Sequence, residues 1–110
     1  MTLNAVKWHR KARETVRGFP KEVKRELGRL ILQLEEGQSL GMPMSRPMPS
    51  VASGTSELRV RGEDGIYRTF YYTRVKGLVI IFHAFKKKTQ KTPPLEIELG
   101  RKRLKEILDD

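Results

Sequence analysis

The chain has 110 residues, no cysteine, and 23 lysines and arginines against 13 acidic residues, which gives a formal net charge of +10 at pH 7. Residues 1–110 are enough for one domain with a single modest core. The lack of cysteine excludes disulfide bonds and thiolate metal sites, and it fits a cytoplasmic protein. The sequence has no signal-peptide pattern and no apolar run that could cross a bilayer, so the positive charge predicts RNA, DNA or a ribosome surface as partner and no membrane.

The first third of the chain predicts a short strand followed by two helices. Residues 5–9 alternate apolar and polar side chains, as a strand does. Residues 10–17 are rich in helix formers, and Gly18 and Pro20 end this helix. Residues 21–36 form the second predicted helix, whose apolar stripe should pack against one face of a sheet. The stripe consists of Val23, Leu27, Leu30, Ile31 and Leu34.

Residues 37–56 are rich in Gly, Pro, Ser and Met and carry Arg46 as their single charge. This composition predicts a connecting loop, which is longer than compact domains usually contain. Methionine adapts to irregular packing, so we expect the loop to be held down by its apolar side chains; the alternative is a mobile loop that acts in binding. These side chains are Leu40, Met42, Met44, Met48 and Val51.

Three strands are predicted next, at residues 57–61, 67–72 and 78–85, followed by a helix at residues 95–108. No helix separates the strands, so hairpins and an antiparallel arrangement are the simplest topology. In the last helix we expect Ile97, Leu104 and Leu108 to point inward. The expected fold is therefore α+β, with two N-terminal helices, an antiparallel sheet of three to four strands and a C-terminal helix.

Basic side chains are concentrated in the predicted sheet. Residues 57–92 contain nine lysines and arginines against three acidic residues, with Arg59, Arg61 and Arg68 on strands and lysines at 86–88 beyond the last strand. Guanidinium and ammonium groups that converge in one hollow can stabilise the charge that develops on a phosphate during RNA cleavage. The alternative is that these charges keep the protein soluble or seat it on RNA without cutting it.

The histidines and tyrosines leave further alternatives open. His83 ends an apolar strand near the lysines, where it is either a buried, hydrogen-bonded imidazole or a general base. Tyr67, Tyr71 and Tyr72 either stack on bases or pack within the sheet. The chain has only two histidines and no carboxylate cluster beside either, so we expect neither a metal site nor a cofactor.

The order of these motifs resembles the RelE/HigB superfamily of toxins from bacterial type II toxin–antitoxin modules, and in particular its phage-derived HigB-like branch. The resemblance rests on Glu-Leu-Arg at 57–59, Tyr-Arg at 67–68 and His-Ala-Phe-Lys-Lys-Lys-Thr-Gln-Lys-Thr-Pro at 83–93. It implies a RelE-like fold and cleavage of mRNA on the ribosome, in which a ribose 2′-hydroxyl attacks the adjacent phosphate without a metal.

By position, the resemblance assigns Arg68 to the scissile phosphate, Arg59 to a basic site on the preceding strand, and one of the lysines at 86–88 to a basic site after the last strand. Where some relatives have a second strand lysine, this chain has Glu57. The residues expected to act in cleavage are Arg68, Arg59, Lys87, Lys88 and His83, and those expected to contact RNA are Arg61, Lys86, Lys91 and Tyr67.

Two other functions are compatible with the same residues. A ParE-like gyrase inhibitor would use the basic surface against a protein or DNA, and a non-catalytic module would bind RNA or the ribosome without cutting. In each case we expect a cognate antitoxin, with a helix-turn-helix DNA-binding domain or an acidic segment laid across the basic sheet.

Overall fold

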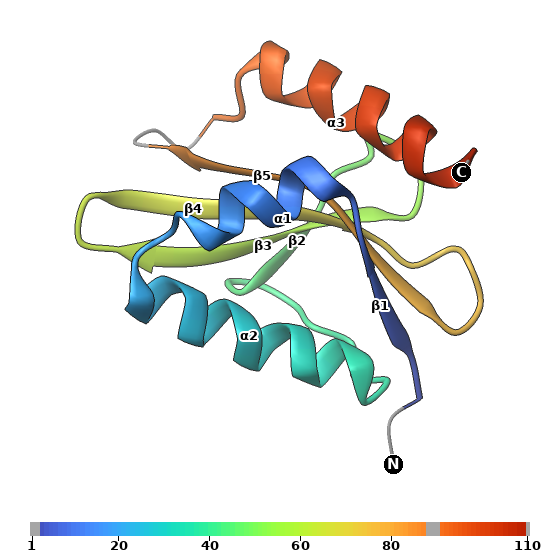
Figure 1. Ribbon diagram of the computed structural model, residues 1–110, viewed down its shortest axis with the longest axis horizontal. Helices are drawn as coiled ribbons and strands as arrows, with labels where there is room; N and C mark the ends of the chain where they lie inside the picture. Colours follow the sequence, from blue (N-terminus) through green and yellow to red (C-terminus); the bar gives the residue numbers. More distant parts are fainter. Residues whose placement is uncertain (1–2, 88–90, 110) are drawn as a thin grey trace.

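The computed structural model describes residues 3–87 and 91–109, which form a mixed, five-stranded sheet with helices on both sides (Figure 1). The strand order is β1-β5-β4-β3-β2. The strands are β1 (Ala5–Trp8), β2 (Ser45–Pro47), β3 (Thr55–Gly62), β4 (Gly65–Tyr72) and β5 (Leu78–Lys87), and the helices are α1 (Arg10–Arg17), α2 (Lys21–Glu35) and α3 (Pro94–Leu108). None of these helices combines the length and the apolar character that a membrane span requires.

The predicted α+β class and the order of the elements are confirmed, with two corrections to the sheet. Strand β1 pairs with β5 in parallel, so the sheet is mixed and not wholly antiparallel. The predicted loop contains the short strand β2, which pairs with β3. Met48 and Val51 are buried as expected, but Met42 is 61% exposed.

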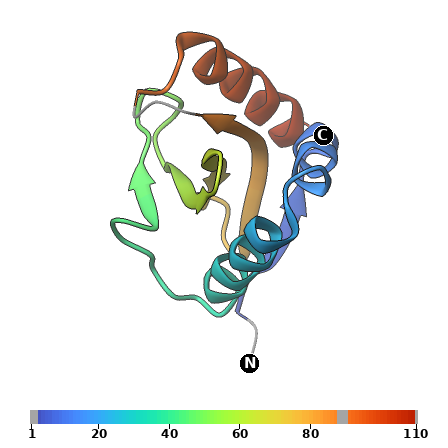
Figure 2. The same ribbon diagram turned by 90° about the vertical axis from the view of Figure 1, so that its left-hand side faces the viewer.

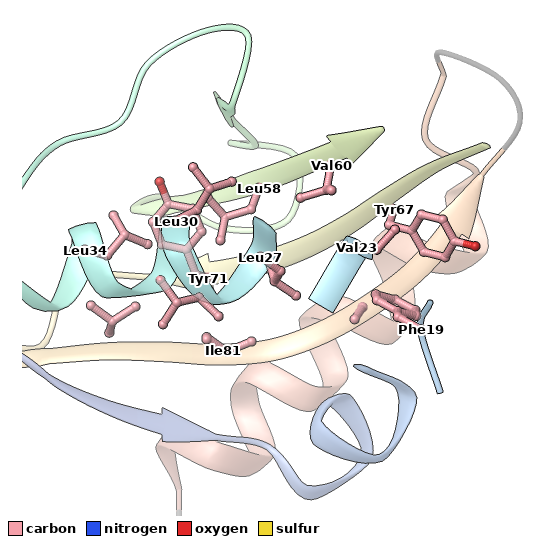
Figure 3. Packing of buried hydrophobic residues seen from close by; sticks show 13 residues of the cluster. Phe19, Val23, Leu27, Leu30, Leu34, Leu58, Val60, Tyr67, Tyr71 and Ile81 are labelled. Carbon is pink, nitrogen blue, oxygen red and sulfur yellow. The ribbon is translucent and has the colours of Figure 1, made fainter. Parts of the chain in front are cut away.

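Helix α2 covers one face of the sheet through the predicted stripe, all five members of which are buried. Figure 3 shows Leu27 and Leu30 of α2 beside Leu58, Tyr71 and Ile81 of the sheet. Removing a leucine side chain of this kind from water contributes about 1.5–3 kcal/mol. This first core therefore fixes α2 against β3, β4 and β5.

Helix α3 covers the opposite face (Figure 2), where Leu104 and Ile107 pack against phenylalanines of β4 and β5. Leu108, expected to point inward, is 42% exposed, and Ile107 is buried in its place. The reason is Gly100, whose missing side chain lets α3 lie directly on Phe70, since an added Cβ would be 2.9 Å from its Cδ2. This close contact sets the rotation of α3 and turns Leu108 outward.

An irregularity in β5 decides which side chains face α3. Phe70 pairs with His83 but Tyr71 pairs with Ile81, so Phe82 is an extra residue in β5. A bulge of this kind shifts the alternation of side chains by one. Both Phe82 and His83 consequently lie on the α3 side, and the residues that follow alternate from His83 onward.

Candidate functional site

Four of the predicted basic residues lie on the α3 face of the sheet. Arg59 on β3 is paired with Arg68 on β4, and Arg61 and Lys87 are both paired with Ile66. Residues directly opposite one another in a sheet share a face. Cross-strand pairing therefore gathers Arg59, Arg61, Arg68 and Lys87 from three strands at one end of the sheet.

Glu57 lies at the centre of this cluster and is fully buried. Its Oε1 is 3.1 Å from Nη1 of Arg68 and 3.6 Å from Nε of Arg59, and its Oε2 has no hydrogen-bond partner among the described residues. Arg46 of β2 is paired directly opposite Glu57. One carboxylate thus holds arginines from neighbouring strands at the same point. We call Arg46, Glu57, Arg59, Arg68 and Lys87 together the arginine cluster.

The guanidinium of Arg68 lies beneath the surface, with a side-chain exposure of 0%. Its Nη1 also donates a hydrogen bond of 3.4 Å to Oγ1 of Thr92. Burial lowers the pKa of Arg68, and Arg59 lowers it further, while Glu57 opposes both effects. Arg68 is therefore held in a closed arrangement between the sheet and the segment before α3.

Lys87 is 8% exposed, and its Nζ has no hydrogen-bond partner within residues 3–87 and 91–109. Burial lowers the pKa of Lys87, and the charge of Arg68 lowers it further. A buried ammonium without a partner is costly, because protein groups do not replace the water it has lost. The neutral form of this amine is thus more accessible than that of a lysine in solvent.

The cluster meets solvent at a hollow of about 280 Å³ between β3, β4 and the loop before β2. Its lining consists of Pro43, Met44, Arg59, Arg61 and Ile66. Arg61 is exposed, whereas the Arg59 side chain is 14% exposed. The hollow is therefore lined by two arginines of one strand, and buried Arg68 is paired with the first of them on the neighbouring strand.

Lys86 and Tyr67 lie on the other face of the sheet. Nζ of Lys86 is 2.8 Å from Oδ2 of Asp64, and the hydroxyl of Tyr67 donates a 2.8 Å hydrogen bond to Oδ1 of the same carboxylate. The ring of Tyr67 packs edge-on against Phe19 in the α2 core. The structure thus separates Lys86 and Tyr67 from the arginine cluster. Lys88 lies outside the described residues.

His83 is buried on the α3 side, where both ring nitrogens are engaged. Nδ1 is 2.7 Å from Nη1 of Arg103, and Nε2 is 2.7 Å from Oε1 of Glu96. Arginine only donates hydrogen bonds, so Nδ1 accepts and Nε2 carries the proton that is donated to Glu96. Burial and, to a lesser extent, the charge of Arg103 lower the pKa of His83, with Glu96 opposing them. This arrangement describes a neutral imidazole that fastens α3 to β5, with neither nitrogen left for a substrate.

Sequence comparison places residues 14–105 in the family described as "Phage derived protein Gp49-like (DUF891)". The chain belongs to this Gp49-like family. The resemblance to the phage-derived branch of the RelE/HigB superfamily is thereby confirmed. The Escherichia coli toxin RelE, solved as an arginine-to-alanine mutant in the free state, has the same fold, with a TM-score of 0.54 and 16% sequence identity over 97% of this chain and 99% of that one. None of the curated proteins matches the chain.

Two members of the arginine cluster in this Gp49-like protein were missed by reasoning from sequence. Glu57 was expected only as a departure from the superfamily pattern, and Arg46 only as the lone charge of a loop. Their proximity depends on the pairing of β2 with β3, for which a three-residue strand offers no sequence signal. The described residues contain no group of three or more His, Cys, Asp or Glu side chains that would hold a metal.

Proposed function

We propose that this Gp49-like protein is the toxin of a type II toxin–antitoxin module and cleaves mRNA on the ribosome without a metal. The observation that carries the proposal is the convergence of Arg59, Arg68 and Lys87 around buried Glu57 on one sheet face. Arginines bind phosphate through two parallel hydrogen bonds, and fixed cations in a partly dry site stabilise charge on phosphorus.

In the proposed reaction, the ribose 2′-hydroxyl oxygen attacks the adjacent phosphorus while its proton passes to the neutral Nζ of Lys87. The bond between phosphorus and the 5′-oxygen breaks, and that oxygen takes a proton from water, leaving a 2′,3′-cyclic phosphate and a 5′-hydroxyl. Arg59 and Arg68 bind the non-bridging phosphate oxygens. The lowered pKa of Lys87, caused by burial and Arg68, supports its role as base.

In this proposal the RNA contacts the basic side chains one after another. Arg59 and Arg61 line the hollow and meet the RNA first. Arg68 is buried and hydrogen-bonded to Thr92, so a phosphate reaches it only after the Thr92 side chain moves aside. The negative charge of the phosphate compensates for the contact that is lost, because Arg68 exchanges a neutral hydroxyl for an anion.

The test compares purified variants on ribosomes carrying a defined mRNA, with new RNA ends mapped. Arg59→Ala and Lys87→Met should each reduce the rate of cleavage by about 10²–10³-fold, the usual cost of removing one group that stabilises a transition state. Arg74→Ala is the matched control, because Arg74 lies beyond the other end of β4 and donates to Ser53. It should cleave like the wild type.

Cleavage by the Arg59 and Lys87 variants at the wild-type rate would remove the arginine cluster from the reaction. Intact messages together with DNA breaks would identify a gyrase inhibitor. Salt-sensitive ribosome binding without new RNA ends would identify a non-catalytic binding module. The proposal includes a cognate antitoxin, for which a helix-turn-helix protein with an acidic segment is expected, and the net charge of +10 supports an acidic partner.

A further inference from the structure

A groove of about 320 Å³ lies between α1 and α2, on the side of the sheet opposite the arginine cluster. Its floor is apolar and is formed by Trp8, Val16, Leu27 and Ile31. Leu27 and Ile31 also belong to the first core, so the floor is a continuation of the packed interior and not a loose surface patch. A rigid apolar floor of this kind suits the side chains of a partner.

The rim of the groove is cationic. Arg13 and Arg17 project from α1 and Lys24 from α2, and all three are exposed. Lys24 reaches toward α1, since its Nζ donates a 3.2 Å hydrogen bond to the backbone carbonyl of Arg17. Among the described residues, no acidic side chain lines the groove. The three positive charges of the rim are thus not balanced by an acidic side chain among the described residues that line the groove.

Gly28 opens the middle of the groove. It lies inside α2, where a glycine costs about 0.5–1 kcal/mol relative to alanine. A Cβ added at Gly28 would meet nothing within 4 Å, so core packing does not require the glycine. One turn further along α2, Leu32 is 51% exposed. The missing side chain therefore leaves room for a partner to approach the helix backbone, with apolar surface continuing beyond it.

We infer that this groove is the docking site for an acidic amphipathic helix of the cognate antitoxin, an assignment that rests on the proposed toxin function. A helix that lays an apolar ridge on the floor would direct its carboxylates toward Arg13, Arg17 and Lys24. A second copy of this chain is a poor occupant, because two chains of charge +10 repel each other. RNA matches the rim, but apart from the indole of Trp8 the floor is aliphatic, so it offers successive bases only one ring on which to stack.

This position separates docking from chemistry. The groove is built on α1 and α2, whereas Arg59, Arg68 and Lys87 face α3. A helix in the groove would leave the hollow beside Arg59 uncovered. It would instead inhibit the toxin by its size, because the complex would be too large for the ribosomal site that admits the toxin alone. An acidic segment laid across the basic face of the sheet is thus not required for docking.

The experiment measures binding of the purified product of the adjoining reading frame by calorimetry, and its ability to relieve growth arrest. Gly28→Met places a side chain in the groove and should weaken binding by about tenfold or more, while the helix gains a better helix former and the melting temperature does not fall. Lys24→Glu should weaken binding similarly. Arg25→Glu changes the net charge equally from a position outside the groove and should bind within about twofold of the wild type.

Wild-type affinity in Gly28→Met would overturn the assignment, as would equal losses in Lys24→Glu and Arg25→Glu. A loss of ribosome binding in Gly28→Met with unchanged antitoxin affinity would assign the groove to RNA instead. Failure of the proposed function is seen separately, as the absence of growth arrest and RNA cleavage by the wild type, while the binding comparison still decides the docking site.

Discussion

Glu57 provides the sharpest test of how the arginine cluster is held together. Glu57 and Arg68 both have side chains of 0% exposure, and the atoms that join them are 3.1 Å apart. Glu57→Leu leaves Arg68 buried beside Arg59 without its carboxylate, and breaking one side of a buried pair costs about 3–5 kcal/mol. At about 4 °C per kcal/mol for a domain of this size, the melting temperature should fall by about 12–20 °C.

The assay is a double-mutant cycle of unfolding in denaturant with Glu57→Leu, Arg68→Met and the double variant. Replacing a buried pair by apolar residues of similar volume is often neutral, so the double variant should be more stable than either single one, with a coupling energy of about 2 kcal/mol or more. Glu26 and Arg29 form the control pair, since they are only 2.6 Å apart but exposed, and Glu26→Gln should change stability little. If the losses of stability in Glu57→Leu and Arg68→Met simply added in the double variant, the two side chains would not depend on each other for charge compensation, and the reasoning would be refuted.

Two further predictions concern helix α3. Burial holds the pKa of His83 below its ordinary value of 6.5, so as the pH decreases below about 6.5 the unfolded chain binds a proton at His83 before the folded chain does, and stability falls. In thermal unfolding, His83→Gln should lose this dependence of stability on pH. An acid profile unchanged in His83→Gln would contradict the neutral imidazole bonded to Glu96. Gly100→Ala would bring a Cβ to 2.9 Å from Phe70 and should destabilise the folded protein by about 1 kcal/mol. Gly28→Ala places its Cβ in open space and should stabilise the protein by about 0.5–1 kcal/mol. Equal effects of the two substitutions in denaturant unfolding would contradict the close packing of α3 on the sheet.

The predictions that succeeded from sequence are those that depend on local repetition. The stripe from Val23 to Leu34 predicts a helix and its buried face, because an α-helix returns to the same side every three or four residues. Arg59 and Arg61 were predicted on one strand, and they share a face in the structure because side chains alternate along a strand. The same reasoning failed for Leu108, because the seating of Gly100 on Phe70, which sets the rotation of α3, is a contact between distant parts of the chain.

The candidate site was predictable only in its parts. Arg59 and Arg68 were named on their strands and Lys87 just beyond the last predicted one, which in the structure extends to include it, but their meeting at Glu57 depends on strand pairing. The extra residue at Phe82 determines that His83 and Lys87 face α3 while Lys86 faces α2. No local pattern marks such a bulge, since it arises where one strand is one residue longer than its neighbour.

The amino-acid sequence by itself therefore determined the helices, the strands other than β2, the buried face of α2 and the strongly basic character of the sheet, because propensity, periodicity and charge are properties of neighbouring residues. Only the tertiary structure decided that Glu57 is the counter-ion of the arginines, that Lys87 is buried without a partner among the described residues, and that Gly28 opens a groove between two helices. These features depend on which distant side chains share a space, and that is settled by the pairing of strands and the seating of helices.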